Sequence, residues 1–467
     1  MDQSTRRSRA PEVLVDLDRS APETLSRQLE RALRDGVRSG SLRAETPLPS
    51  TRVLATELGV SRGLVVAAYA QLGAEGYLRL RRNAPPVVAS GVGVAAEARK
   101  LAAGPAWPHN LRPDLPDYGA FPRAEWLKSY RAALNSAPDS ELSYGDVRGS
   151  AQLREALVAY LGRVRGVVGD PEHTLVCSGF AQAVSLLCGV LARAGRKRIA
   201  VEDPGHAVVR QLVARSGLEP VPIPVDAGGI DVDAVDASAP DAVLVTPAHQ
   251  FPTGVVLAPE RRARLLAWAE KTDALVIEDD FDSEYRYDRP PVGSLQGLMP
   301  ERVVYCGTAS KTLAPTLRLG WIVAPAELVW PLVEQVMYTV IAPPRLEQRA
   351  FADFLLRGEL DRHLRRMRLR YRRRRDALVR ELGRRLPELE VRGLAAGLYV
   401  EAVLPPGTDE GRVVEEAQAR GVALAGMAAH CVEAVRDPAL LLGYAVAPEP
   451  SLRRAVAMLA EAVRAAA

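Results

Sequence analysis

In the N-terminal part of the chain, short segments with regularly spaced apolar residues are separated by turn residues. In residues 24–39 (TLSRQLERALRDGVRS) an apolar residue recurs at every fourth position, which predicts an amphipathic helix that ends at Gly40. Two shorter helices are predicted in LPSTRVLATELGVSRGLVVAAYAQLGAEGYL, separated at Gly59 and capped by Ser50 and Ser61. The runs YLRLRR and PPVVAS then predict a hairpin. This order is typical of a winged helix-turn-helix.

The rest of the chain predicts a second, larger domain. Residues 90–110 are rich in Ala, Gly and Pro without a clear period and suit a linker after a first domain at 20–89. From residue 111 onward, helical stretches alternate with short apolar runs such as DAVLVTP, DALVIEDD and RVVYCGT. That alternation indicates an α/β fold with a mostly parallel sheet, covered on both faces. An arginine-rich helix and a mixed α/β tail follow, which we assign to a smaller C-terminal subdomain at 343–467.

Charge separates the two predicted domains. The net charge of the 467 residues is +4, and residues 1–90 alone carry 14 arginines and 10 acidic residues, so the whole excess is N-terminal. A basic N-terminal domain favours a nucleic-acid partner. The four cysteines are scattered and form no metal-binding spacing with the six histidines. Without an apolar leader or an 18-residue apolar stretch, we expect a cytoplasmic protein with no membrane or metal partner.

One of the five lysines stands directly after a predicted strand. Lys311 lies in the turn of VVYCGTASKTLAPTLRLGW, and a sheltered lysine at a strand end can form a Schiff base with pyridoxal phosphate. Taken alone, this motif is more often a solvated loop lysine. Asp279, at the end of the preceding strand, would suit the pyridine nitrogen, although such an acid is more often a helix cap. Thr308 and Arg318 would suit the phosphate, or Arg318 a structural ion pair.

In order along the chain, several motifs resemble one known family. The runs LSYGDVRGSAQLREALVAYL, VCSGFAQA, VEDPGHAVVR, VTPAHQFPTG, VIEDDFDSEYRY and YCGTASKTLAPTLRLGW resemble the fold-type-I aminotransferase-like domain of MocR/GabR-type transcriptional regulators. The N-terminal helices resemble the GntR-type winged helix that precedes it in these regulators. The resemblance implies pyridoxal 5'-phosphate as cofactor, with an aldimine at Lys311, the pyridine nitrogen on Asp279 and the phosphate on Thr308, Arg318 and the backbone of Gly179 and Phe180. It further implies that Gly145 and residues 252–254 shape the pocket.

The chain departs from this family at three positions. His206 stands where an aromatic residue usually stacks on the pyridine ring, and Phe281 replaces a tyrosine whose hydroxyl would bind the 3'-oxygen. The run ALLLGYAVAPE lacks the arginine that holds a substrate carboxylate in aminotransferases. These changes weaken the case for efficient transamination and leave the case for cofactor binding intact, so any activity would be weak and transaminase-like.

The predicted DNA contacts lie at helix starts and in the wing. Arg52 opens the second helix, Ser61, Arg62 and Gly63 open the third, and Arg81 and Arg82 lie in the wing. Leu64, Ala68 and Leu72 should face the core, leaving Val66 and either Tyr69 or Gln71 outward. The run at 362–375 holds nine arginines. We favour a dimer or interdomain face for that helix over a main DNA-reading role.

The sequence thus predicts a transcriptional regulator that binds promoter DNA and senses pyridoxal phosphate, or a small amine or amino acid that reacts with it. Resemblance to the family implies a homodimer with a head-to-tail arrangement. Two alternatives stay open: a working aminotransferase with vestigial DNA binding, and a regulator whose second domain is a cofactor-free dimerisation scaffold.

Overall fold

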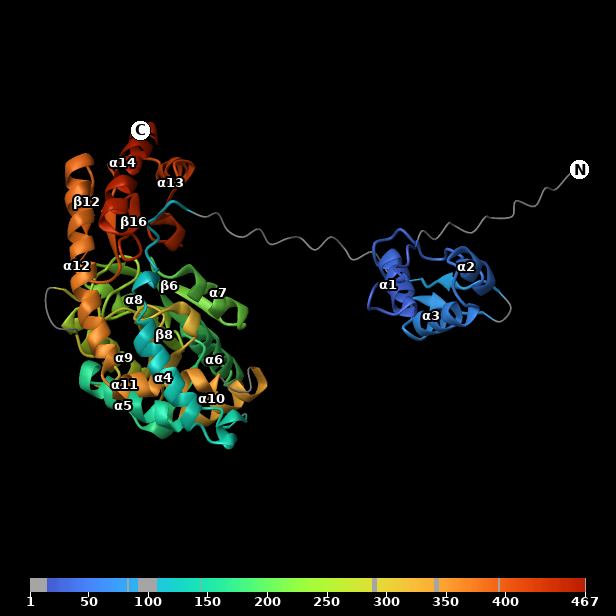
Figure 1. Cartoon of the computed structure of the whole chain (residues 1–467). Coiled ribbons are helices and arrows are strands. Elements are labelled where there is room, and N and C mark those ends of the chain that lie inside the picture. Colours follow the sequence, from blue (N-terminus) through green and yellow to red (C-terminus); the bar gives the residue numbers. More distant parts are fainter. Residues whose placement is uncertain are drawn as a thin grey trace, which may run out of the picture. The chain divides into compact units, whose positions relative to one another are not determined.

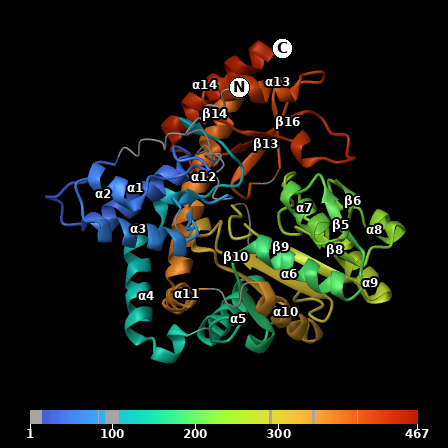
Figure 2. The ribbon, with the colours of Figure 1, turned by 90° about the vertical axis from the view of Figure 1, so that its right-hand side faces the viewer.

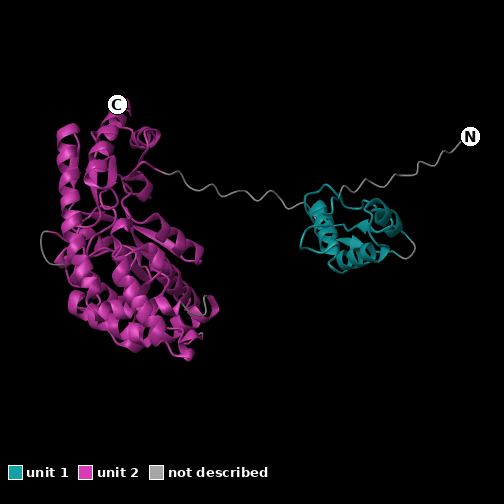
Figure 3. Ribbon diagram, viewed as in Figure 1, with its two compact units in different colours: residues 1–105 teal, residues 106–467 magenta. Residues whose placement is uncertain are grey.

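The chain folds as two compact units, residues 1–105 and 106–467, each with its own hydrophobic core (Figure 3). A computed structural model describes residues 15–81, 84–90, 107–143, 145–287, 292–339, 344–393 and 395–466. The division falls inside the stretch at 90–110 where the composition indicates a linker.

The first unit is a three-helix core with a small hairpin. Its elements are α1 (Leu25–Arg38), α2 (Thr51–Glu57), α3 (Arg62–Ala74), β1 (Leu78–Arg79) and the antiparallel β2 (Val87–Val88). Ser50 and Ser61 cap α2 and α3 as expected, because their side chains accept from the amides of Val53 and Leu64. Ala68 and Leu72 are buried against α1. The predicted helix-turn-helix is confirmed.

The second unit is built on an eight-stranded sheet of order β4-β11-β10-β9-β8-β5-β6-β7. Only β11 and the short β7 run antiparallel to their neighbours. The strands are β4 (Thr174–Cys177), β5 (Arg198–Asp203), β6 (Glu219–Asp226), β7 (Gly229–Ile230), β8 (Ala242–Val245), β9 (Leu275–Asp280), β10 (Val303–Thr308) and β11 (Gly320–Val323). The central strands are buried on both faces, as the continuous apolar runs predict.

Helices cover both faces of this sheet. On one face, α6 (Phe180–Arg193), α7 (Ala207–Arg215) and α10 (Ala326–Thr339) share one hydrophobic cluster with the strands, and α6 lies against the sheet in Figure 2. On the other face lie α5 (Ala151–Arg165), α8 (Val232–Ser238) and α9 (Pro259–Thr272). The helix pair α4 (Arg123–Ser136) and α11 (Arg345–Leu356) packs beside α5. This is the fold class predicted from the sequence.

A smaller C-terminal subdomain completes the unit. The long α12 (Glu359–Arg385) packs along α14 (Glu449–Ala466), and α13 (Glu410–Ala419) packs on α14 (Figure 1). Their sheet has the order β12-β13-β16-β15, formed by β12 (Glu390–Arg392), β13 (Tyr399–Val403), β15 (Ala425–Gly426) and β16 (Ala439–Gly443). The segment after the linker joins this subdomain, because β3 (His109–Asn110) pairs with β14 (Val422–Ala423).

Candidate functional site

A cavity of the second unit lies at the carboxyl ends of the parallel strands β5, β8, β9 and β10. It has a volume of about 200 Å³. Such strand ends are where open α/β sheets bind ligands. Seven of the eight residues that the sequence assigns to the cofactor line it: Phe180, His206, Asp279, Phe281, Thr308, Lys311 and Arg318. The eighth, Gly179, lies next to it as the N-cap of α6.

Lys311 reaches into the cavity from the turn after β10. The turn is held by the buried Thr308, whose side-chain oxygen bonds Ser310 and the carbonyl of Leu319. The Lys311 amine donates to the main-chain carbonyl of Asp114, which also lines the cavity. Lys311 and its partner Asp114 therefore both belong to the cavity lining.

Asp279 is the penultimate residue of β9, and its carboxyl group is buried at the cavity wall. Burial raises the pKa of Asp279 well above its ordinary value, and the neighbouring carboxyls of Asp280, Asp282 and Glu202 add to the effect. Its Oδ1 atom is buried without a hydrogen-bond partner. A buried oxygen of this kind costs free energy until a donor reaches it, and a protonated pyridine nitrogen is such a donor.

A phosphate could be held where β4, α6 and β11 meet. Gly179 adopts a positive φ of 91° at the start of α6, and the Arg318 side chain reaches the carbonyl of Ser178 beside it. The backbones approach so closely here that a Cβ on Gly320 would lie 2.7 Å from the Cα of Gly179. Free amides at a helix start next to a guanidinium suit an anionic group.

Aromatic side chains form another part of the cavity lining. The His206 ring lies 5.4 Å from the ring of Phe251, and Phe281 meets Phe251 edge to face at 6.3 Å. His206 also caps α7, because its Nδ1 accepts from the Val208 amide at 3.2 Å. The two departures read from the sequence, His206 and Phe281, therefore both face the cavity.

Sequence reasoning missed Glu202, Phe251 and Asp114 in this cavity. Burial raises the pKa of Glu202 to about 7, and its Oε2 accepts hydrogen bonds from Thr246 and, at 3.2 Å, from Gln250. Glu202 is the penultimate residue of β5, as Asp279 is of β9, and an acid at this position in VEDPG is the signal that would have revealed it.

The donors and acceptors fit pyridoxal phosphate. A lysine amine, a buried carboxyl oxygen without a partner, and a guanidinium beside a helix start lie around one cavity. These are the groups that its aldehyde, pyridine nitrogen and phosphate require.

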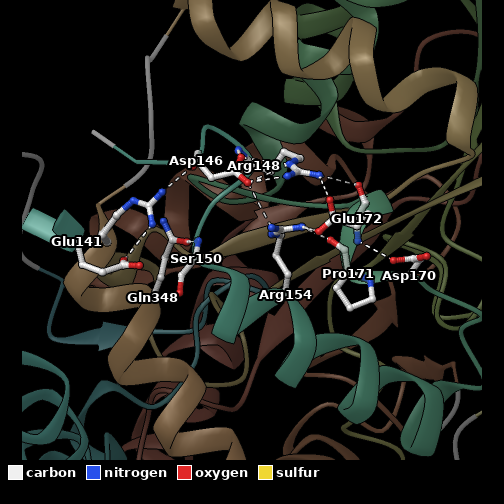
Figure 4. Close-up of polar contacts among 10 residues, drawn as sticks. Glu141, Asp146, Arg148, Ser150, Arg154, Asp170, Pro171, Glu172 and Gln348 are labelled. Atoms are coloured by element: carbon white, nitrogen blue, oxygen red, sulfur yellow. Dashed lines mark hydrogen bonds and ion pairs between the residues drawn. The ribbon is translucent and has the colours of Figure 1, made fainter. Parts of the chain in front are cut away.

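Gly145 and residues 252–254 are not among the cavity-lining residues. Gly145 instead belongs to a loop held by ion pairs, in which Asp146 binds Arg148 at 2.7 Å and Arg154 at 3.3 Å (Figure 4). Arg345 donates to the Asp146 carbonyl at 2.9 Å. A Cβ on Gly145 would lie 2.1 Å from the Arg345 guanidinium, so glycine makes room for this contact.

In the first unit, Arg52, Ser61, Arg62, Gly63 and Arg81 are all exposed. Arg82 lies outside the described residues. Tyr69, offered as one of two outward-facing side chains, is only 2% exposed, and its hydroxyl donates to the Pro49 carbonyl at 3.0 Å. That placement was wrong, because the tyrosine hydroxyl finds a partner within the core and its ring fills the space between helices.

Among the described residues, no helix is long and apolar enough to cross a bilayer. Within the same residues, no group of three or more His, Cys, Asp or Glu side chains is placed to hold a metal ion.

Two family models match the chain. Residues 25–88 match the bacterial regulatory proteins of the gntR family, and residues 118–436 match aminotransferase class I and II. The chain is 33% identical over 456 residues to the HTH-type pyridoxine biosynthesis transcriptional regulator PdxR of Corynebacterium glutamicum, covering 96% of this chain and 98% of that one. It is also 33% identical over 476 residues to the probable rhizopine catabolism regulatory protein MocR of Rhizobium meliloti, covering 96% of each.

Solved structures show the same fold for the second unit. The multiple substrate aminotransferase of Thermococcus profundus aligns with a TM-score of 0.71 at 27% identity, over 80% of this chain and 96% of that one.

Proposed function

Because the chain belongs to the MocR-type transcriptional regulators of the GntR family, which carry an aminotransferase-like domain, we propose that it senses pyridoxal phosphate, or a small amine or amino acid that reacts with it. One observation carries this proposal: Lys311 and the buried Asp279 line the same cavity, and the Oδ1 atom of Asp279 has no hydrogen-bond partner there.

Each cavity residue has a role in this proposal. Pyridoxal phosphate, when bound, supplies an aldehyde that reacts reversibly with primary amines and a ring that withdraws electrons. Lys311 supplies the amine that attaches the cofactor covalently, and Asp279 holds a proton at the pyridine nitrogen. Arg318, Thr308 and the start of α6 bind the phosphate.

The side chains that line the cavity favour effector sensing over catalytic turnover. Phe281 has no hydroxyl to place beside the 3'-oxygen. The other arginine of the cavity, Arg210, already donates to the carbonyls of Gly205 and His430. Effector sensing requires only that the ligand bind one conformation better than the other. Sustained amino transfer without sequence-specific DNA binding would instead favour the aminotransferase reading.

We propose that the regulator acts as a head-to-tail homodimer on promoter DNA, and hence in the cytoplasm. A ligand that prefers one arrangement of the two DNA-binding units changes which spacing of half-sites is bound well.

The test is an absorbance titration in the near-ultraviolet and visible range with added pyridoxal phosphate. The unaltered protein and Lys271→Ala, which removes an exposed lysine of α9, should show the same saturable band. Lys311→Ala should lack it. A band of equal amplitude in Lys311→Ala would refute the covalent role. No band in any of the three would favour the cofactor-free scaffold.

A further inference from the structure

The outward face of α3 carries unusually little hydrogen-bonding chemistry. Gln71 and Ala74 are exposed towards its end, and nearer its start, after Arg62, the exposed residues are Gly63, Val66, Ala67 and Ala70. The Val66 side chain is the largest of these four, and the residue is 45% exposed. In a helix-turn-helix, this second helix of the motif enters the major groove and its N-terminal residues meet the base edges.

Polar side chains next to this face are engaged within the protein. The Tyr69 hydroxyl donates to the Pro49 carbonyl at 3.0 Å inside the core. The Gln71 amide donates to Glu75 at 2.8 Å, one turn further along α3. On α2, the Thr56 hydroxyl donates to the Arg52 carbonyl at 3.0 Å. Among the described residues of α3 after Arg62, Gln71 is therefore the one exposed side chain with an amide donor, and Glu75 already accepts from it.

We propose that α3 reads thymine C5-methyl groups through Val66 and its small apolar neighbours, while Arg52 and Arg62 contact phosphates. The proposal rests on the DNA-binding function and names what that surface recognises. In the major groove, thymine alone of the four bases presents a methyl group, and apolar side chains recognise it by contact.

The small size of the side chains beside Val66 supports the same assignment. Gly63, Ala67 and Ala70 add no side chain longer than a methyl group, so the helix surface beside Val66 can approach the base edges closely. The guanidinium of Arg62 lies near the Thr51 hydroxyl, 3.4 Å from Nε, at the junction of the α2 and α3 starts. Helix starts of this kind commonly contact phosphates and fix the register of the helix in the groove.

The experiment uses the full chain and a pool of random duplexes about three helical turns long. The most enriched duplex is resynthesised with dU in place of dT, which keeps every base pair and removes only the methyl groups. We expect affinity to fall about fourfold for each contacted methyl group. Val66→Ala should bind the dT duplex more weakly and lose most of the difference between dT and dU.

The control is Arg52→Ala, which should weaken binding to both duplexes by the same factor because a phosphate contact does not depend on the base. Equal affinity of the unaltered protein for dT and dU duplexes, with DNA binding intact, would overturn the methyl readout and leave the regulator function standing. A difference that persists fully in Val66→Ala would overturn the assignment to α3. Enrichment of no duplex would count against both.

Discussion

Replacing Glu202 by glutamine isolates the effect of one buried carboxyl on the stability of the second unit. The native chain holds the Glu202 proton until about pH 7, whereas an unfolded chain releases it near the ordinary value of 4.5. Between these two pH values the unfolded state binds fewer protons, so the free energy of unfolding falls as the pH rises. Glutamine has the same shape, stays neutral and keeps an oxygen that can accept from Thr246.

The size of the effect follows from the interval of about 2.5 pH units between the two values. At 1.36 kcal/mol for each unit, Glu202 costs the native state about 3 kcal/mol of stability above pH 7. For a unit of about 360 residues this corresponds to about 4 °C in melting temperature.

The assay is the melting temperature of the cofactor-free protein between about pH 4.5 and pH 8. The melting temperature of Glu202→Gln relative to the unaltered protein should rise by about 4 °C across this range. Glu388→Gln, which changes an exposed carboxyl, serves as the control and should give a constant difference. A constant difference for Glu202→Gln as well would refute the reasoning, because it would mean that folding does not shift the pKa of the Glu202 carboxyl.

Three further changes test other parts of the structure. Asp279→Asn should lower the affinity for pyridoxal phosphate about tenfold or more, measured by absorbance titration, because the charged partner of the pyridine nitrogen is lost. Gly145→Ala, at a φ of 59°, should destabilise the second unit by more than about 1 kcal/mol in urea unfolding, and Arg345→Ala in the same chain should restore part of the loss. Ser61→Ala should cost about 1 kcal/mol in the first unit only, because it removes the α3 cap.

The sequence predicted strands such as β8, β9 and β10 because each is a short apolar run buried on both faces. It did not predict β6, whose residues alternate between buried and exposed, or the short β7. It did not predict the direction of β11, which runs antiparallel to β10 and β4. An apolar run does not indicate in which direction its strand will pair. The turn before β11 also depends on a left-handed backbone at Arg318, with a φ of 50°, and arginine rarely adopts that conformation.

Some residues of the candidate site could also be predicted from the sequence, and others could not. Lys311, Asp279 and Arg318 could be proposed because their chemistry is rare at strand ends. Asp114 could not, because it contacts Lys311 through a main-chain carbonyl and lies in a segment without a period. Phe251 is an ordinary apolar residue within a turn, and only the folded chain shows that it faces His206.

The pairing of β3 with β14 also sets an order of events during synthesis. His109 aligns with Val422, so the segment that follows the linker finds its partner only after most of the chain has left the ribosome. The hydrophobic core of the first unit is built from residues 15–88 alone, and N-terminal domains generally fold first as they emerge. For much of each round of translation, a finished DNA-binding unit is therefore tethered to an unfinished aminotransferase-like domain. A chain interrupted before residue 422 would carry the DNA-binding unit without a completed aminotransferase-like domain.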